Sequence, residues 1–407
     1  MRASILCAIL SFISTTLATL AKPTVAITNG TVQGLPANKA GIKTFLGIPF
    51  AAPPVGSLRW QSPQPATAFR GTYNATAFGA SCYSADLVVP QIGPVSEDCL
   101  TVNLWTAAKS AGPRRPVMVW IFGGGFQFGS SNSPLYNGSK LAEHDVIVVT
   151  FNYRLGVFGF LGLAELDRQG TPSGDYGLQD QLAALRWVKE NIAAFGGDPE
   201  NVTVFGQSAG AHSIGLLLAS PLSAGLFNKT ILESGAYWDS EHGSIRTFNE
   251  ARAQGAAFQM QVGAASVAEL RAISAETLNS AALWNASTDP GLTAFAPSID
   301  NYVVPDVPAE MFDSGKAQNV PLLAGFTAAE EDAFLLRVVP HSTPAQYNES
   351  AGTVFGSNAT AFLSRYPRST EVQANQSALA LLGDLVIREQ TFEAIDRQYN
   401  VNGQDVV

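Results

Sequence analysis

Short apolar runs alternate with a helical pattern in the middle of the chain. Residues 116–122 (PVMVWIF) and 145–153 (DVIVVTFNY) are continuous apolar segments rich in β-branched residues, which is typical of strands covered on both faces. Residues 178–192 carry apolar side chains every three or four positions, which predicts an amphipathic helix. The apolar run at 202–205 (VTVF) follows this helix. The order of strand, helix and strand predicts an α/β fold, with a mostly parallel central sheet covered by helices on both faces.

The remaining segments extend this pattern. Residues 22–60 contain short strands and turns, and their prolines exclude helix at the end of the segment. A further strand is predicted near 229–238, and the alanine-rich segment 249–283 is predicted to be helical. Residues 321–334 are typical of a strand followed by an acidic turn. We therefore expect a single α/β domain over residues 22–407.

Composition and charge narrow the classes of function. The 407 residues are 46% hydrophobic and 14% charged, a balance that excludes an intrinsically disordered chain. The formal net charge of −9 argues against a nucleic-acid partner, because such proteins need basic patches. A small neutral or organic substrate fits this charge better.

The first 21 residues, MRASILCAILSFISTTLATLA, are typical of a signal peptide cleaved near Ala21. A membrane anchor is the alternative, but the apolar stretch is too short for a bilayer, and no later segment has eighteen uninterrupted apolar residues. We therefore expect a secreted glycoprotein without a stable membrane anchor. Nine N-x-[ST] sequons agree with this route. They lie at Asn29, Asn74, Asn137, Asn201, Asn228, Asn285, Asn348, Asn358 and Asn375.

The chain has three cysteines, of which Cys7 leaves with the predicted signal peptide. Cys82 and Cys99 then remain in an oxidising compartment, which favours a disulfide between them. Two buried free thiols are the alternative.

Residues 195–210 (FGGDPENVTVFGQSAG) contain the strongest chemical signal. A turn and a short strand run into G-x-S-x-G, in the order of strand, sharp turn and helix. Such a turn exposes Ser208 at the rim of a sheet, and the free N–H groups of the next helix point at a developing oxyanion. Ser208 is therefore the candidate nucleophile. A chance glycine turn is the alternative.

This stretch resembles the nucleophile elbow of the type-B carboxylesterase/lipase family of α/β-hydrolases, which includes fungal lipases and cholinesterases. Residues 45–60 (FLGIPFAAPPVGSLRW), 97–105 (EDCLTVNLW) and 152–162 (NYRLGVFGFLG) resemble other segments of that family. The resemblance implies a serine hydrolase that cleaves carboxylic esters through an acyl-enzyme. It implies a small-molecule ester substrate and no metal or cofactor.

The resemblance also assigns an oxyanion hole. Gly123, Gly124 and Gly125 follow a predicted strand, where backbone N–H groups without neighbouring side chains approach a substrate closely. By the family pattern, Gly124 and Gly125 donate from this loop and Ala209 donates from the elbow. A merely flexible turn is the alternative.

The acid and the acyl pocket are assigned in the same way. The family pattern G-x-x-x-x-E-G-x-x-F, begun at Gly325, places the acid at Glu330. Glu331 stands where the family has glycine, and an exposed acidic turn is the alternative. Ser234 resembles a second serine near the family's triad. Tyr237 and Trp238 are the candidate walls of the acyl pocket, although aromatic residues after a strand are more often core.

No catalytic histidine is identified. The chain order of the fold is serine, acid, then histidine, and the only histidine after Glu330 is His341, eleven positions on. His212 lies on the nucleophile's own helix, while His144 and His242 are expected in capping or solvent-exposed positions. The family places its histidine in a later loop. The sequence is therefore interpreted as a family member that lacks its C-terminal part.

Two further functions remain open. The first is a triacylglycerol lipase of the same family, with the apolar loop 85–95 as its lid. The second is a non-catalytic cholinesterase-like binding protein or an inactive truncated form. An intact serine and elbow favour the esterase. No motif in the sequence specifies an oligomeric state.

Overall fold

The computed structural model describes residues 22–84, 93–108, 112–237, 245–282, 295–330 and 343–403. Within them, seven strands form a central sheet in the order β10-β9-β8-β6-β7-β5-β3. The strands are β3 (Lys43–Pro49), β5 (Thr101–Thr106), β6 (Arg115–Ile121), β7 (Ile147–Phe151), β8 (Gly197–Gln207), β9 (Lys229–Glu233) and β10 (Leu322–Gly325). A second sheet of three strands has the order β1-β2-β4. Its strands are β1 (Thr24–Ile27), β2 (Gly30–Gln33) and β4 (Thr72–Asn74).

The central sheet is mixed, with a parallel body. β10, β9, β8, β6 and β7 pair in parallel, whereas β5 and β3 add two antiparallel pairings at one side. Every residue of β7 is buried, as its continuous apolar run predicted, whereas β6 alternates between buried and more exposed positions. Every residue of β5 is also buried. The predicted α/β fold is confirmed. Since the parallel strands share one direction, their carboxyl ends meet at one edge, where loops from different strands converge.

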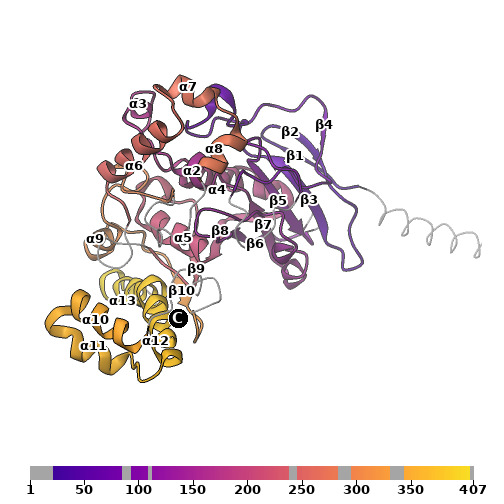
Figure 1. Cartoon of the computed structure of the whole chain (residues 1–407). Coiled ribbons are helices and arrows are strands. Elements are labelled where there is room, and N and C mark those ends of the chain that lie inside the picture. Colours follow the sequence, from indigo (N-terminus) through magenta and orange to yellow (C-terminus); the bar gives the residue numbers. More distant parts are fainter. Residues whose placement is uncertain are drawn as a thin grey trace, which may run out of the picture.

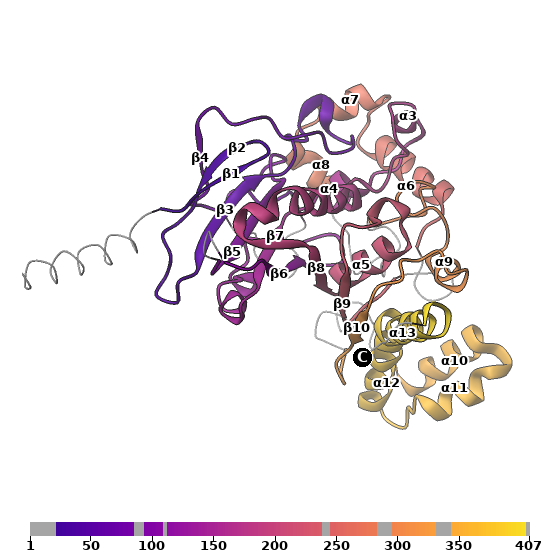
Figure 2. The ribbon, with the colours of Figure 1, turned by 180° about the vertical axis from the view of Figure 1, so that it is seen from behind.

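The helices surround the sheet (Figures 1 and 2). They are α2 (Gly156–Phe160), α3 (Ala164–Asp167), α4 (Tyr176–Asn191), α5 (Ala209–Ala219), α6 (Phe248–Gln261), α7 (Val267–Ala272), α8 (Ala275–Ala281), α9 (Pro308–Asp313), α10 (Pro344–Phe355), α11 (Ala359–Arg365), α12 (Glu371–Gly383) and α13 (Glu389–Asn402). A π-helical turn, Asp384–Arg388, joins α12 to α13. The alanine-rich segment predicted to be helical forms the three helices α6, α7 and α8.

Helix α5 carries the chain away from the candidate nucleophile through the core. All of its residues are buried, so it reads as apolar on every side. It can approach its neighbours closely because it contains glycine: a Cβ atom on Gly215 would lie 1.5 Å from the carbonyl oxygen of Ala236. This close contact sets how near α5 packs to the segment that follows β9.

The C-terminal helices lie beside one edge of the central sheet. Figures 1 and 2 both place α12 and α13 next to β10, while β1, β2 and β4 lie at the other end of the molecule. The side chain of Gln398 on α13 donates to the carbonyl oxygens of Gln318 and Val320, just before β10. These bonds hold α13 against the edge strand.

The predicted signal peptide, residues 1–21, lies outside the described residues. In the part of the chain that the structure describes, none of the helices combines the length and the apolar character needed to cross a membrane.

Candidate active site

Ser208 occupies a strained turn between β8, which ends at Gln207, and α5, which begins at Ala209. Its backbone angles are φ 55° and ψ −125°, a conformation that residues with a Cβ atom rarely adopt. Glycine is required on both sides of it. A Cβ atom would lie 2.7 Å from the Ile121 carbonyl oxygen if placed on Gly206, and 2.0 Å from it if placed on Gly210.

Backbone hydrogen bonds hold this turn on two sides. The N–H of Ser208 donates to the carbonyl of Glu233 at 2.9 Å, and the N–H of His212 donates to the carbonyl of Ser208 at 2.8 Å. The Ser208 side chain is half-buried, at the carboxyl end of β8. As the first residue of α5, Ala209 has an N–H group that no bond inside the helix can use. An anion beside Ser208 would therefore meet this N–H and the positive end of the helix dipole.

The glycine loop after β6 touches the nucleophile. A Cβ atom on Gly123 would lie 2.4 Å from the Gln207 carbonyl oxygen and 3.0 Å from Cβ of Ser208. Gly124 and Gly125 follow with φ values of +116° and +59°. Only glycine adopts such angles freely, so this stretch of backbone carries no side chains. The geometry suits donation from backbone N–H groups to an oxyanion on an atom attacked by Ser208.

Glu330 and Ser234 meet beside the elbow. The Ser234 hydroxyl donates to Oε1 of Glu330 at 2.8 Å, and the same oxygen accepts from the N–H of Thr327 at 2.5 Å. Ser234 is buried and has a positive φ of 55°, while its N–H donates to the Gly325 carbonyl at 2.8 Å. Two donors near the ends of β9 and β10, the Ser234 hydroxyl and the Thr327 N–H, therefore fix the position of this carboxylate. Glu331 lies outside the described residues.

An open depression of about 960 Å³ lies in front of this carboxylate. Glu330, Ser234 and Glu233 line one part of it, and Gln207, the neighbour of Ser208, lines another. It is large enough for a drug-sized ligand. Among the described residues, no histidine lines it.

The described part of the chain contains two histidines, His144 and His212. His144 ends a short 3₁₀-helix (Leu141–His144) ahead of β7, at the opposite end of the parallel strands from Ser208. His212 is buried next to Gly235, and burial lowers the pKa of its imidazole to about 3. A group with that pKa is a weak general base near neutral pH. His242 and His341 lie outside the described residues.

Tyr237, a candidate wall of the acyl pocket, lies in the core. Its side chain is fully buried, its ring lies 5.2 Å from that of Phe312 on α9, and its hydroxyl bonds to Arg397 on α13. The residue packs the sheet against these two helices, which is the more frequent role of an aromatic residue after a strand. Trp238 lies outside the described residues.

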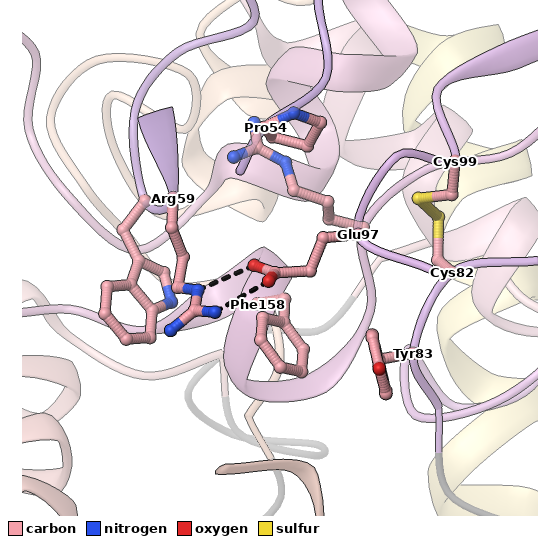
Figure 3. A pocket seen from close by; sticks show the side chains of 9 residues that line it. Pro54, Arg59, Cys82, Tyr83, Glu97, Cys99 and Phe158 are labelled. Atoms are coloured by element: carbon pink, nitrogen blue, oxygen red, sulfur yellow. Dashed lines mark hydrogen bonds and ion pairs between the residues drawn. A yellow bond between two sulfur atoms is a disulfide. The ribbon is translucent and has the colours of Figure 1, made fainter. Parts of the chain in front are cut away.

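Cys82 and Cys99 form the expected disulfide. Figure 3 shows this bridge beside the ion pair of Arg59 and Glu97, in which the guanidinium binds both carboxylate oxygens at 2.6 Å. The cavity between these groups has a volume of about 10 Å³, enough for at most one water molecule. This corner of the molecule is therefore structural. Most of the loop 85–95 between the cysteines lies outside the described residues.

Sequence reasoning missed the residues that hold the glycine loop. The Tyr153 hydroxyl donates to the carbonyl of Phe122 at 2.9 Å, and the Asn152 amide oxygen accepts from the N–H of Ser131 at 2.9 Å. The available signal was a pair of polar side chains that ends a wholly apolar strand. As for metals, no three histidine, cysteine or acidic side chains come together as a possible ligand set within the described ranges.

The chain is similar to known esterases. The family described as the carboxylesterase family matches residues 21–401. Fumonisin B1 esterase of Sphingopyxis macrogoltabida is 39% identical over 363 residues, which cover 88% of this chain and 65% of that protein. Para-nitrobenzyl esterase of Bacillus subtilis (strain 168) is 43% identical over 311 residues, which cover 74% of this chain and 61% of that protein. The chain thus spans less than two thirds of the length of these curated relatives.

The similarity extends to three dimensions. A solved structure of a PNB esterase matches with a TM-score of 0.79 at 37% sequence identity. The match covers 93% of this chain and 78% of that chain.

Proposed function

The chain belongs to the carboxylesterase family, and from this we propose that it acts as a serine hydrolase that cleaves carboxylic esters through an acyl-enzyme. The observation that carries the proposal is the contact between two strained segments. Ser208, at φ 55°, lies against Gly123 of the glycine loop, so the candidate nucleophile is in contact with the loop that carries the candidate N–H donors.

In the proposed reaction, Oγ of Ser208 attacks the carbonyl carbon of the ester. The carbonyl oxygen becomes an oxyanion, which the N–H groups of Gly124, Gly125 and Ala209 stabilise. The bond from carbon to the alcohol oxygen then breaks, the proton lost by Oγ passes to the departing oxygen, and an acyl group remains on Ser208. Attack by water through a second tetrahedral intermediate releases the carboxylic acid and restores the serine.

Glu330 takes the part of the acid that orients and charge-stabilises the base. Its carboxylate is already fixed by Ser234 and Thr327, as a group with an orienting role needs. The general base itself is assigned to none of the described residues. Within them, His144 lies at the wrong end of the sheet and His212 is a buried weak base.

Labelling with a fluorophosphonate tests the proposal, because these reagents phosphonylate activated serines. We expect the adduct on Ser208 in the folded protein. Ser208→Ala should abolish labelling and lower the rate of any ester hydrolysis by about 10⁴-fold or more. Ser213→Ala, one turn further along α5, is the matched control and should label normally. Labelling on another serine would support the non-catalytic alternative on the same fold. So would the absence of any labelling in a correctly folded protein.

A lipase remains the nearest enzymatic alternative. Hydrolysis of emulsified long-chain triacylglycerol at rates above those for dissolved short-chain esters would support it. The exposed side chains of Leu323 and Phe326 at the rim of the depression give an apolar surface on which such a substrate can rest.

We also propose that the protein is secreted and glycosylated. The signal-like residues 1–21, the disulfide and the sequons support this. Asn74 and Asn137 are exposed and are the proposed glycan acceptors. Asn228 is a poor acceptor, because it is half-buried and its side-chain oxygen is held by the N–H of Val202 on β8 at 3.0 Å. Peptide mapping of protein from a culture medium should find glycans on the first two and none on Asn228.

A further inference from the structure

The loop that carries the oxyanion glycines has positive φ angles at several positions. We define the oxyanion loop as residues 122–131, from the end of β6 onward. Besides Gly124 and Gly125, it contains Phe126, a non-glycine residue at φ 61°. Such a conformation persists only when the surrounding structure fixes it.

One short segment supplies bonds to the beginning, the middle and the end of this loop. The Tyr153 hydroxyl donates to the Phe122 carbonyl at 2.9 Å. The N–H of Gly156 donates to the Phe126 carbonyl at 2.8 Å. At the far end, the N–H of Ser131 donates to the Asn152 side chain at 2.9 Å. All three partners belong to residues 152–156, which run from the end of β7 to the first residue of α2 and which we call the clamp segment.

Tyr153 makes the bond nearest to the chemistry. Its side chain is fully buried, and its ring stacks on that of Phe122 with centroids 4.5 Å apart. Phe122 immediately precedes Gly123, which lies against Cβ of Ser208. Burial raises the pKa of the Tyr153 phenol, so the hydroxyl keeps its proton and remains a donor at any physiological pH.

The clamp segment is itself anchored to α4. The backbone N–H and the guanidinium of Arg154 all donate to the carboxylate of Asp180, at 3.0, 2.7 and 2.8 Å. Both side chains are buried, so water does not compete for these bonds. The position of the oxyanion loop is thus set by a helix of the core.

We propose that the clamp segment pre-organises the oxyanion loop, with Tyr153 as a positioning residue for ester hydrolysis. This inference rests on the proposed function of the loop. Oxyanion stabilisation depends on N–H groups that are already aimed before reaction. Without the Tyr153 hydroxyl, the Phe122 carbonyl loses its partner and the glycine N–H groups after it lose their fixed direction.

Tyr153→Phe is the direct test, because it removes one oxygen atom and preserves the stacked ring. Tyr73→Phe is the matched control: its hydroxyl also donates to a backbone carbonyl, that of Gly47, at 2.8 Å, outside the loop. Amide hydrogen exchange followed by mass spectrometry reports on the loop without requiring activity. We expect exchange in the peptide covering 122–131 to rise about tenfold or more in Tyr153→Phe and to stay unchanged in Tyr73→Phe.

Kinetics supply the second measurement. With p-nitrophenyl acetate, we expect kcat of Tyr153→Phe to fall about ten- to a hundredfold while KM stays within about threefold, because the lost interaction acts in the transition state. Tyr73→Phe should keep both parameters. A purely structural role for Tyr153 would lower the thermal midpoint without this separation of kcat from KM.

The outcomes separate the clamp from the proposed function. Unchanged exchange over 122–131, or a rise spread evenly over the whole chain, overturns the clamp. Faster exchange confined to the loop with unchanged kcat overturns the positioning role. Faster exchange confined to the loop, in a protein that hydrolyses no ester and labels with no fluorophosphonate, supports the clamp and rejects the proposed function.

Discussion

The hydroxyl of Ser234 donates to the carboxylate of Glu330 across 2.8 Å, joining the ends of β9 and β10. Ser234 adopts a positive φ of 55° to make this contact, and its own N–H is bonded to Gly325 at the end of β10. A short strained residue is thus held in place by one edge strand and in turn fixes an acidic side chain. Such an arrangement restricts the direction in which Glu330 can accept a further hydrogen bond.

Ser234→Ala tests the value of this contact. Because the carboxylate loses one of its two described donors, we expect about a tenfold loss of kcat in ester hydrolysis and a loss of about 1 kcal/mol in the free energy of unfolding. Ser314→Ala is the control, since that hydroxyl bonds to the Glu310 carbonyl on α9 at 2.7 Å, away from the site. Equal kinetics in the two variants would show that Thr327 alone positions Glu330.

The glycines of the elbow carry a prediction about folding. A Cβ atom on Gly210 would lie 2.0 Å from the backbone oxygen of Ile121, which cannot move without disturbing β6. We expect Gly210→Ala to cost about 3 kcal/mol or more of stability, measured by denaturant titration or as a failure to express folded protein. Gly352→Ala in α10 meets no atom within 4 Å and should be neutral or slightly stabilising. Similar stability of both variants would contradict the close contact.

The elbow was predictable because its signals are local. Residues 195–210 contain the turn, the strand, the glycines and the start of the helix. The conformation of each of these parts is determined by residues close to it in the sequence. The alternation of apolar runs with an amphipathic segment predicted the parallel sheet for the same reason. Tyr153 was missed because its partner, Phe122, lies 31 positions away and is reached only through the parallel pairing of β6 with β7.

Long-range packing also explains the buried position of Tyr237. Nothing near this residue in sequence indicates that Arg397, 160 positions later, bonds to its hydroxyl. The aromatic pair of Tyr237 and Trp238 suggested a pocket wall. The ring of Tyr237 packs against Phe312 of α9, a contact that the hydrophobic pattern of the sequence does not predict. Motifs with a chemical role of their own were thus predictable. The role of a side chain that depends on contacts with residues far away in the sequence was not.

The disulfide gives a third prediction. Cys82 and Cys99 are 17 positions apart, and closing a loop of this length restricts the unfolded chain by about 3 kcal/mol in the chain-entropy estimate. We expect the double variant Cys82→Ala, Cys99→Ala to lose roughly that amount in denaturant titration. Non-reducing mass spectrometry of the wild-type protein should show both thiols blocked, and two free thiols there would refute the bridge.

A buried pair of carboxyl groups makes stability depend on pH. Asp175, which precedes α4, and Asp300 are both fully buried. Asp175 accepts from the N–H of Ser298 at 3.1 Å, and Asp300 accepts from the N–H groups of Tyr302 and Val304 at 2.9 Å. In the described structure, one oxygen of each carboxyl group has no hydrogen-bond partner. Two such groups are stabilised when at least one of them holds a proton.

The charges around this pair do not neutralise it. The charge of Arg252 on α6 acts on Asp175, but its guanidinium is already bound to both oxygens of Asp167 at 2.7 and 2.8 Å. Burial raises the pKa of Asp300 to about 6, and burial together with the charge of Asp300 raises the pKa of Asp175 well above its ordinary value. The folded protein therefore binds protons more tightly here than the unfolded chain.

Since both pKa values are raised on folding, the stabilisation is complete below the unfolded value of about 4 and is lost as pH rises through about 6. We expect Asp175→Asn to flatten this decline and to raise the free energy of unfolding at pH 8 by about 2 kcal/mol relative to wild type, because an amide carries no charge and so removes the repulsion with Asp300. Asp306→Asn, an exposed change in the segment that follows, is the control and should leave the slope as in wild type. Thermal midpoints measured from pH 4 to pH 9 give the comparison. A wild-type midpoint that stays constant between pH 5 and pH 8, or a decline equally steep in Asp175→Asn, would mean that the pair holds no proton at neutral pH.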